Sequence, residues 1–311
     1  MLWILGNDSE QMAYLNSLWS KYMPEESPKV AVDAHPRLSG IMDTINATDA
    51  HGPATKLPSE FYDKKGRAVL DRIAVEEWFA GYNESSEYRK LGIGALMGDV
   101  VDRMVSTAVE GGWRSESTAS GSGNPESGKT IKFAMSGCHD TTLAAMLSSV
   151  GGFQDESWPP FTSSVAVELF SRTPHSASIP GTMLEEFSNP SVAAKKKKLG
   201  VLSRLFGKSA PNQDTSSETA REPLSSFPEG DRESLQKHYV RIRYNDRPVT
   251  IPGCAAKPQN HLPGDETFCT LDAFKAIVDK FTPNDWQTEC TQNLGAGLHG
   301  PADSSKSVAG F

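Results

Sequence analysis

The sequence predicts a protein of the α/β class from two patterns of apolar residues. In the first hundred residues, apolar side chains recur at the spacing of amphipathic helices. In later segments, apolar and polar residues alternate, as they do in half-buried strands. Residues 131–150 join both patterns as a strand, a tight loop and a helix, which is the unit that presents ligands at the carboxyl end of a sheet.

The N-terminal region is expected to be mainly helical. Ser9 precedes the first apolar stripe and is a suitable N-cap, because its hydroxyl can accept a backbone hydrogen bond from the first turn. We interpret the stripes as core faces rather than as cofactor-binding surfaces. Residues 111–128, rich in Gly and Ser, predict a surface loop. The helices are expected at residues 9–22, 38–47, 67–80 and 90–109.

The α/β core is predicted in two parts, residues 131–171 and 238–290. Alternation predicts strands over residues 131–136, 165–169 and 240–244. The remaining core elements are a helix over 141–150 that stops at Gly151, a turn-rich loop over 252–264, and an amphipathic helix over 271–281 before Pro283.

Two segments are expected to lie outside this core. Residues 172–237 combine charged, Ser- and Pro-rich clusters with little apolar periodicity, and they predict a disordered insertion between two strands. Residues 291–311 are rich in Gly and Ser and predict a flexible tail. Four lysines in the insertion predict either a solvated surface helix, the favoured reading, or a weak contact with an anionic surface. These are Lys195, Lys196, Lys197 and Lys198.

Composition excludes several classes of function. The net charge of −8 over 311 residues argues against a nucleic-acid partner. No apolar run reaches about 18 residues, so no transmembrane segment is expected, and the start of the chain does not have the form of a signal peptide. The compartment is left open. No cofactor or metal is expected, because the cysteines lack the close spacing of zinc ligands. Cys254 and Cys269 flank a loop and form either a local disulfide or two reduced thiols.

A short segment, Ser136 to Thr142, carries the main chemical signal. His139 and Asp140 stand between the predicted strand and the predicted helix, where helix amides favour a phosphate group. His139 can donate a hydrogen bond to a phosphate oxygen, and Asp140 can protonate a leaving alkoxide as a general acid. The competing interpretation is structural: Asp140 is also an ordinary N-cap for the following helix.

The residues around this pair resemble the C-terminal signature of the histidine acid phosphatase family, most closely the branch that contains lysophosphatidic acid phosphatase and fungal-type members. The resemblance is firm over residues 131–170 and 238–290 and looser over 1–110. It rests on Ser136-Gly137-Cys138-His139-Asp140-Thr141-Thr142-Leu143, Gly151-Gly152-Phe153, Trp158-Pro159-Pro160-Phe161, Val165-Ala166-Val167-Glu168-Leu169, Val240-Arg241-Ile242-Arg243-Tyr244-Asn245, Pro252-Gly253-Cys254 and Phe268-Cys269-Thr270-Leu271.

This resemblance implies a three-layer, phosphoglycerate-mutase-like α/β domain with a helical cap over residues 9–110. It also implies hydrolysis of a phosphomonoester, such as a lysophospholipid, through a phosphohistidine intermediate. By motif, His139 becomes a phosphate-binding residue and Asp140 the proton donor. A phosphoglycerate-mutase-like transferase shares the fold but fits the His-Asp-Thr-Thr context less well.

The chain departs from the family at the nucleophile. Family members carry the attacking histidine in an Arg-His-Gly-x-Arg segment, and no histidine of this sequence follows an arginine. His35-Pro36-Arg37 lacks the glycine that lets backbone approach a phosphate, and His51-Gly52 lacks both arginines. No nucleophile is therefore assigned.

Two explanations of the missing nucleophile are open. In the first, the chain is a fragment, incomplete at its N-terminus, of a domain that extends over residues 1–290 here. In the second, it is a non-catalytic relative that binds phosphorylated ligands or proteins. The first is favoured, because loss of a central strand would leave an open sheet edge. In either case the chain alone is expected to be inactive.

Overall fold

The computed structural model describes residues 9–110, 131–153, 157–172, 222–292, 294 and 308–311, all within one unit of the chain. The predicted loop over 111–128 and the four lysines at 195–198 lie outside these residues. The described part mixes helices with one sheet, whose strand pairs are antiparallel. This architecture is compatible with the α/β class that the sequence predicts.

The predicted N-terminal helices are confirmed. The Ser9 hydroxyl accepts from the backbone N–H of Met12 over 3.2 Å, as expected of an N-cap, and Asp63 caps α3 by accepting from Gly66 over 2.7 Å. Their apolar faces meet in one cluster that contains Met12, Leu15, Trp19, Ile41 and Leu70. The bounds are α1 Glu10–Trp19, α2 Leu38–His51 and α3 Lys64–Glu84.

The helix predicted over 90–109 begins differently from the prediction. A short helix, α4 (Ser86–Arg89), leads into a π-helical turn at Lys90–Gly94, and α5 (Ala95–Glu110) follows. The turn brings Gly94 against the backbone carbonyl of Phe281, where a Cβ atom would collide. The close approach of two backbones therefore requires glycine at this position.

A five-stranded sheet forms the other part of the fold. The strand order is β1-β2-β5-β4, and β3 also pairs with β2. Asn245 and Asp246 connect β2 to β3, and both have positive φ, of 47° and 65°, as in a two-residue type I′ hairpin turn. The strands are β1 Val165–Ser171, β2 His238–Tyr244, β3 Arg247–Val249, β4 His261–Leu262 and β5 Asp265–Thr270.

Strand register confirms the predicted alternation of β1 and β2. Val167 lies opposite Ile242, and Val165 opposite Tyr244, so the apolar residues of both strands share one face. On the other face, Glu168 accepts from Nε of Arg241 over 2.8 Å. The alternation is thus explained by an apolar face and a paired charged face.

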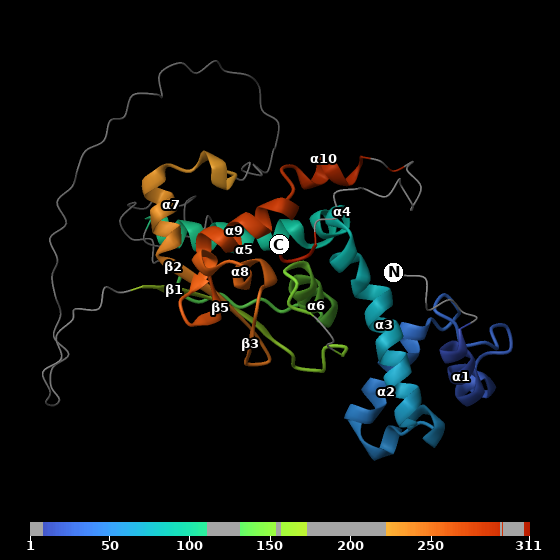
Figure 1. Ribbon diagram of the computed structural model, residues 1–311. Coiled ribbons are helices and arrows are strands. Elements are labelled where there is room, and N and C mark those ends of the chain that lie inside the picture. The colour runs from blue at the N-terminus through green and yellow to red at the C-terminus, as the bar shows by residue number, and fades with distance from the viewer. Residues whose placement is uncertain (1–8, 111–130, 154–156, 173–221, 293, 295–307) are drawn as a thin grey trace, which may run out of the picture. The chain divides into compact units, whose positions relative to one another are not determined.

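Helices cover the apolar face of this sheet. Figure 1 shows α5 and α9 along the sheet, with α7 beside them; the three helices contact one another, and α7 and α9 contact β2. Val240, Phe274 and Leu147 are fully buried in the shared core. No helix among the described residues is long and apolar enough to cross a membrane. The bounds are α6 Asp140–Ser149, α7 Glu229–Gln236, α8 Pro252–Ala255, α9 Leu271–Val278 and α10 Trp286–Cys290.

The strand predicted over residues 131–136 is wrong for this structure. Ile131 forms an isolated bridge, and the residues that follow are irregular. Phe133 and Met135 are 81% and 87% exposed. An alternating segment becomes a strand only where a neighbouring strand accepts its backbone hydrogen bonds, and within the described residues no such neighbour extends beyond Ile131.

Both segments predicted to lie outside the core contain packed residues at one end. In the insertion predicted over 172–237, residues 222–237 are ordered, because Leu235 of α7 is fully buried in the core. In the tail predicted over 291–311, Ala309 is buried and the carbonyl of Gly310 accepts from Gly253 over 2.7 Å. Both predictions are therefore wrong for these ends, where a few apolar residues decide the packing, and most of the rest of each segment lies outside the described residues.

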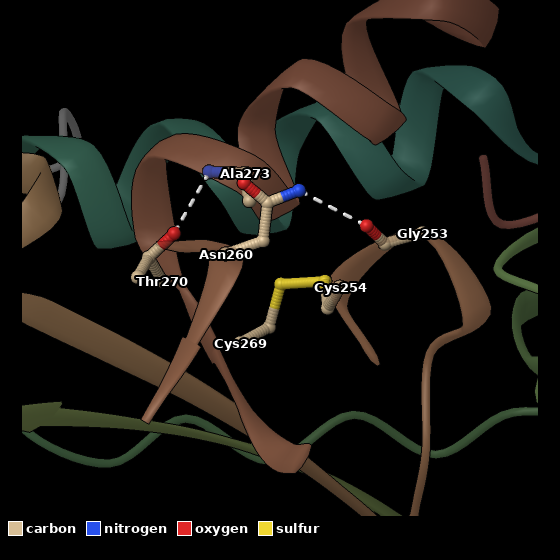
Figure 2. Close-up of a disulfide and its surroundings, with 6 residues drawn as sticks. All are labelled: Gly253, Cys254, Asn260, Cys269, Thr270 and Ala273. Atoms are coloured by element: carbon tan, nitrogen blue, oxygen red, sulfur yellow. Dashed lines mark hydrogen bonds between the residues drawn. A yellow bond between two sulfur atoms is a disulfide. The ribbon is translucent and has the colours of Figure 1, made fainter. Parts of the chain in front are cut away.

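A disulfide closes the loop that was predicted over 252–264. Cys254 of α8 and Cys269 of β5 are bonded, with Cα atoms 5.4 Å apart (Figure 2). Within the same loop, the Asn260 side chain donates to the carbonyl of Gly253 over 3.0 Å. The sequence left open whether these cysteines form a disulfide or two reduced thiols, and the structure shows the disulfide. Strand β5 was missed, because residues 265–270 were assigned neither to the predicted loop nor to the predicted helix.

Candidate active site

His139 and Asp140 lie at the start of α6, as the sequence predicts. His139 occupies the N-cap position with extended backbone, its carbonyl accepts from the Thr142 N–H over 3.0 Å, and its side chain makes no capping hydrogen bond. Asp140 is the first residue of the helix. The imidazole of His139 is exposed beside the positive end of the helix, an arrangement that suits an anion.

Both carboxylate oxygens of Asp140 accept hydrogen bonds. Oδ1 accepts from the backbone N–H of Thr141 over 2.7 Å. Oδ2 accepts from the indole N–H of Trp158, also over 2.7 Å. The N-cap role foreseen for Asp140 is wrong, because His139 occupies that position and Asp140 is the first helical residue. One oxygen of Asp140 accepts from the next backbone N–H, and the other accepts from a residue of a distant loop.

The Asp140 side chain lines a cavity of about 590 Å³. The other walls are helices α2 and α3 and the loop from Ser157 to Phe161. Asp43 and Asp49 come from α2, and Arg67 and Asp71 come from α3. The cavity has room for a small organic group beside Asp140.

Carboxylates outnumber cations on the cavity wall. Arg67 is its only lysine or arginine within the described residues, and it pairs with Asp49 over 2.8 Å. Desolvation raises the pKa of Asp43, and the neighbouring Asp140 carboxylate raises it further. Burial likewise raises the pKa of Asp71, against the opposing effects of a hydrogen bond from Trp158 and the charge of Arg67. The wall therefore favours neutral or cationic groups over anionic ones.

Trp158 connects the elements of the site. Its backbone N–H donates to Oδ1 of Asp71 over 2.9 Å. Its ring packs on Phe79, with centroids 5.1 Å apart, and meets Trp78 edge-on at 6.1 Å. It contacts both apolar clusters of the described structure, the one around the sheet and the one formed by the N-terminal helices.

The two histidines that were rejected as nucleophiles lie at the two ends of α2 and do not line the cavity. His35 precedes α2, and the nearby Arg37 pairs with Glu77 over 3.0 Å. His51 is the last residue of α2, followed by Gly52 with φ of 101° as the C-cap. Neither is among the residues that line the cavity.

Sequence reasoning missed most of the cavity wall. Trp158 was noticed only as part of a motif, and Asp43 and Asp71 gave no signal because isolated carboxylates on helices usually face solvent. Within the described residues, no group of three or more His, Cys, Asp or Glu side chains is arranged to hold a metal ion.

The sequence similarity found for this chain supports an acid phosphatase family. The chain is 32% identical, over 92% of its length, to a protein of Schizosaccharomyces pombe described as a probable acid phosphatase. It spans about half, 52%, of that relative's length. No protein-family model matches the chain.

Proposed function

We propose that this chain carries the phosphate-binding and proton-donating half of a phosphomonoester hydrolase of the histidine acid phosphatase type. The observation that carries the proposal is the position of Asp140 beside His139, with its carboxylate on the wall of a cavity at the start of a helix. Similarity to a probable acid phosphatase over 92% of the chain supports the same reaction class.

The proposed reaction proceeds in two steps. A histidine nitrogen attacks phosphorus, the bond from phosphorus to the leaving oxygen breaks, and Asp140 gives its proton to that oxygen. Water then attacks the phosphohistidine and gives a proton to the Asp140 carboxylate, the nitrogen–phosphorus bond breaks, and inorganic phosphate leaves. His139 and the amides at the start of α6 are proposed to bind phosphoryl oxygens throughout.

The attacking histidine is proposed to come from outside the sequence given. Phe133 and Met135 are exposed on a segment that follows the isolated bridge at Ile131. A strand that carries an Arg-His-Gly segment would pair with this edge and cover both side chains, and it would bring the nucleophile toward His139. Such an addition fits the proposed three-layer, phosphoglycerate-mutase-like fold, with the N-terminal helices as its cap.

The substrate is proposed to be a phosphomonoester of an uncharged or cationic alcohol. Among the described residues, Asp43, Asp49 and Asp71 share the cavity wall with one arginine, so a second anionic group on the leaving alcohol would be repelled. A lysophospholipid with an uncharged leaving alcohol meets this condition. The lysines at 195–198 stay a prediction of a solvated surface helix, with weak contact to an anionic surface as the less favoured alternative.

The nucleophile assignment is tested first on the chain alone. Hydrolysis of p-nitrophenyl phosphate at acidic pH is expected to equal the buffer blank. Robust turnover that disappears in His139→Ala or Asp140→Asn would show that a nucleophile exists within this sequence. Genomic sequence upstream of the Met1 codon provides a second check, since an in-frame Arg-His-Gly-x-Arg segment is expected there.

The reaction itself is tested in a fusion with the part of the Schizosaccharomyces pombe relative that this chain does not match. The fusion is expected to hydrolyse both p-nitrophenyl phosphate and glycerol 2-phosphate. Asp140→Asn should reduce the glycerol 2-phosphate rate about 10²–10⁴-fold and the p-nitrophenyl phosphate rate less, because nitrophenolate leaves without a proton. Asp246→Asn, at an exposed turn outside the cavity wall, is the control. A folded fusion that hydrolyses neither ester would refute the proposed function.

A further inference from the structure

We propose that Trp158 and Asp71 are positioning residues for Asp140: Asp71 fixes the backbone of Trp158, and the Trp158 indole fixes the carboxylate. The inference rests on the proposed function for the role of Asp140 as the proton donor. It assigns tasks to two residues outside the His139-Asp140 segment.

Two hydrogen bonds orient the Asp140 carboxylate. The Trp158 indole donates to Oδ2 of Asp140, and the Thr141 backbone donates to Oδ1, each over 2.7 Å. Two donors on different oxygens fix the plane of the carboxylate. Each oxygen can accept a further hydrogen bond, so the transferred proton still has a place on the carboxylate. A general acid must keep such an orientation toward the leaving oxygen.

Residues of α3 fix the position of Trp158. Asp71 accepts its backbone N–H over 2.9 Å, and the Phe79 and Trp78 rings pack against the indole. All three residues belong to α3, so one long helix sets both the backbone and the ring of Trp158. The orientation of Asp140 at the start of α6 is thereby set by a helix 56 or more residues earlier in the chain.

The neighbouring charges matter for testing this contact. Asp43 and Asp49 on α2, Arg67 and Asp71 on α3, and His139 beside the acid all stand near this contact. The indole N–H of Trp158 donates to Asp140 and not to any of these five groups. A titration seen at the indole is therefore assigned by substituting these carboxylates one at a time.

The test uses the full chain and the indole N–H resonances of its six tryptophans in nitrogen-15 NMR. Trp158→Phe identifies the Trp158 resonance. We expect this resonance to shift with pH as Asp140 is protonated, and we expect Asp140→Asn to abolish that shift. Trp286 is an internal control, because its indole donates to the backbone carbonyl of Leu91 over 2.8 Å. Its resonance also reports whether each variant is folded.

Asp71 is tested by a pair of substitutions. Asp71→Ala should move the Trp158 resonance toward that of a solvent-exposed indole and weaken its dependence on pH. Asp71→Asn keeps an oxygen that accepts the Trp158 N–H and should retain the wild-type titration, which also excludes Asp71 as its source. Asp43→Asn and Asp49→Asn are carboxylate controls on the same wall and should keep the titration.

Two results would overturn the inference. One is a Trp158 resonance that does not respond to pH in the folded chain, and the other is a response that survives Asp140→Asn. Neither result depends on turnover. A fusion without phosphatase activity would refute the proposed function and leave the indole titration as expected, so the two failures are distinguishable.

Discussion

The backbone N–H of Trp158 donates to Oδ1 of Asp71 over 2.9 Å, although the two residues are 87 positions apart. Burial has the largest effect on the Asp71 carboxyl and raises its pKa above the ordinary value of 3.8. The folded protein therefore binds a proton at Asp71 more readily than the unfolded chain does.

Asp71 is expected to make the protein more stable under acid conditions. A raised folded pKa gives a contribution that is fully present below 3.8, the unfolded value, and lost as pH rises through the folded value. Urea unfolding at about pH 4 and about pH 7 measures this contribution. In the wild-type protein, Asp71 adds to the free energy of unfolding at the acid pH but not at the neutral pH. In Asp71→Asn this increment is lost, so the free energy of unfolding at acid pH should fall relative to that at neutral pH. An unchanged difference would contradict the assignment.

The segment after Ile131 is expected to exchange its amide hydrogens rapidly. Residues 132–139 are exposed, and their backbone is not part of a strand ladder. Mass-spectrometric hydrogen exchange should show fast exchange there and slow exchange in β2, whose residues pair on both sides. In the phosphatase fusion, residues 132–136 should become protected. Protection in the chain alone would mean that another segment already covers them.

Loss of the disulfide is expected to lower stability. Cys254 and Cys269 close a loop of 15 positions, for which the entropy of the unfolded chain predicts about 3 kcal/mol. The double variant Cys254→Ala and Cys269→Ala should lose about 2–4 kcal/mol in urea unfolding. Cys290→Ala, at a free cysteine, is the control and should change little. Equal stability of the wild-type protein and the double variant would contradict a stabilising role for the disulfide.

Gly94 and Gly40 are expected to respond oppositely to alanine. At Gly94 a Cβ atom would collide with the carbonyl of Phe281, so Gly94→Ala should cost at least about 1–3 kcal/mol through overpacking. At Gly40 of α2 no atom lies within 4 Å of the added Cβ, so Gly40→Ala should stabilise by about 0.5–1 kcal/mol. Thermal unfolding of both variants tests the π-helical turn. Similar effects at the two positions would contradict this packing.

Several helices and the strands β1 and β2 could be predicted from the sequence because their signals are local. The helices over 9–22 and 141–150 follow from apolar spacing and capping residues, and the strands around Val167 and Ile242 follow from alternation. The same alternation over 131–136 failed. A helix closes its own hydrogen bonds, whereas a strand needs a partner that its own residues do not specify.

The candidate site divides in the same way. The sequence by itself identified His139 and Asp140 and their place at the start of a helix, because the motif and the helix signal are contiguous. Only the tertiary structure brought Trp158 to Asp140 across 18 positions and Asp71 to Trp158 across 87. These contacts depend on how α3 packs against α6, and packing of distant side chains leaves no periodic trace in the sequence.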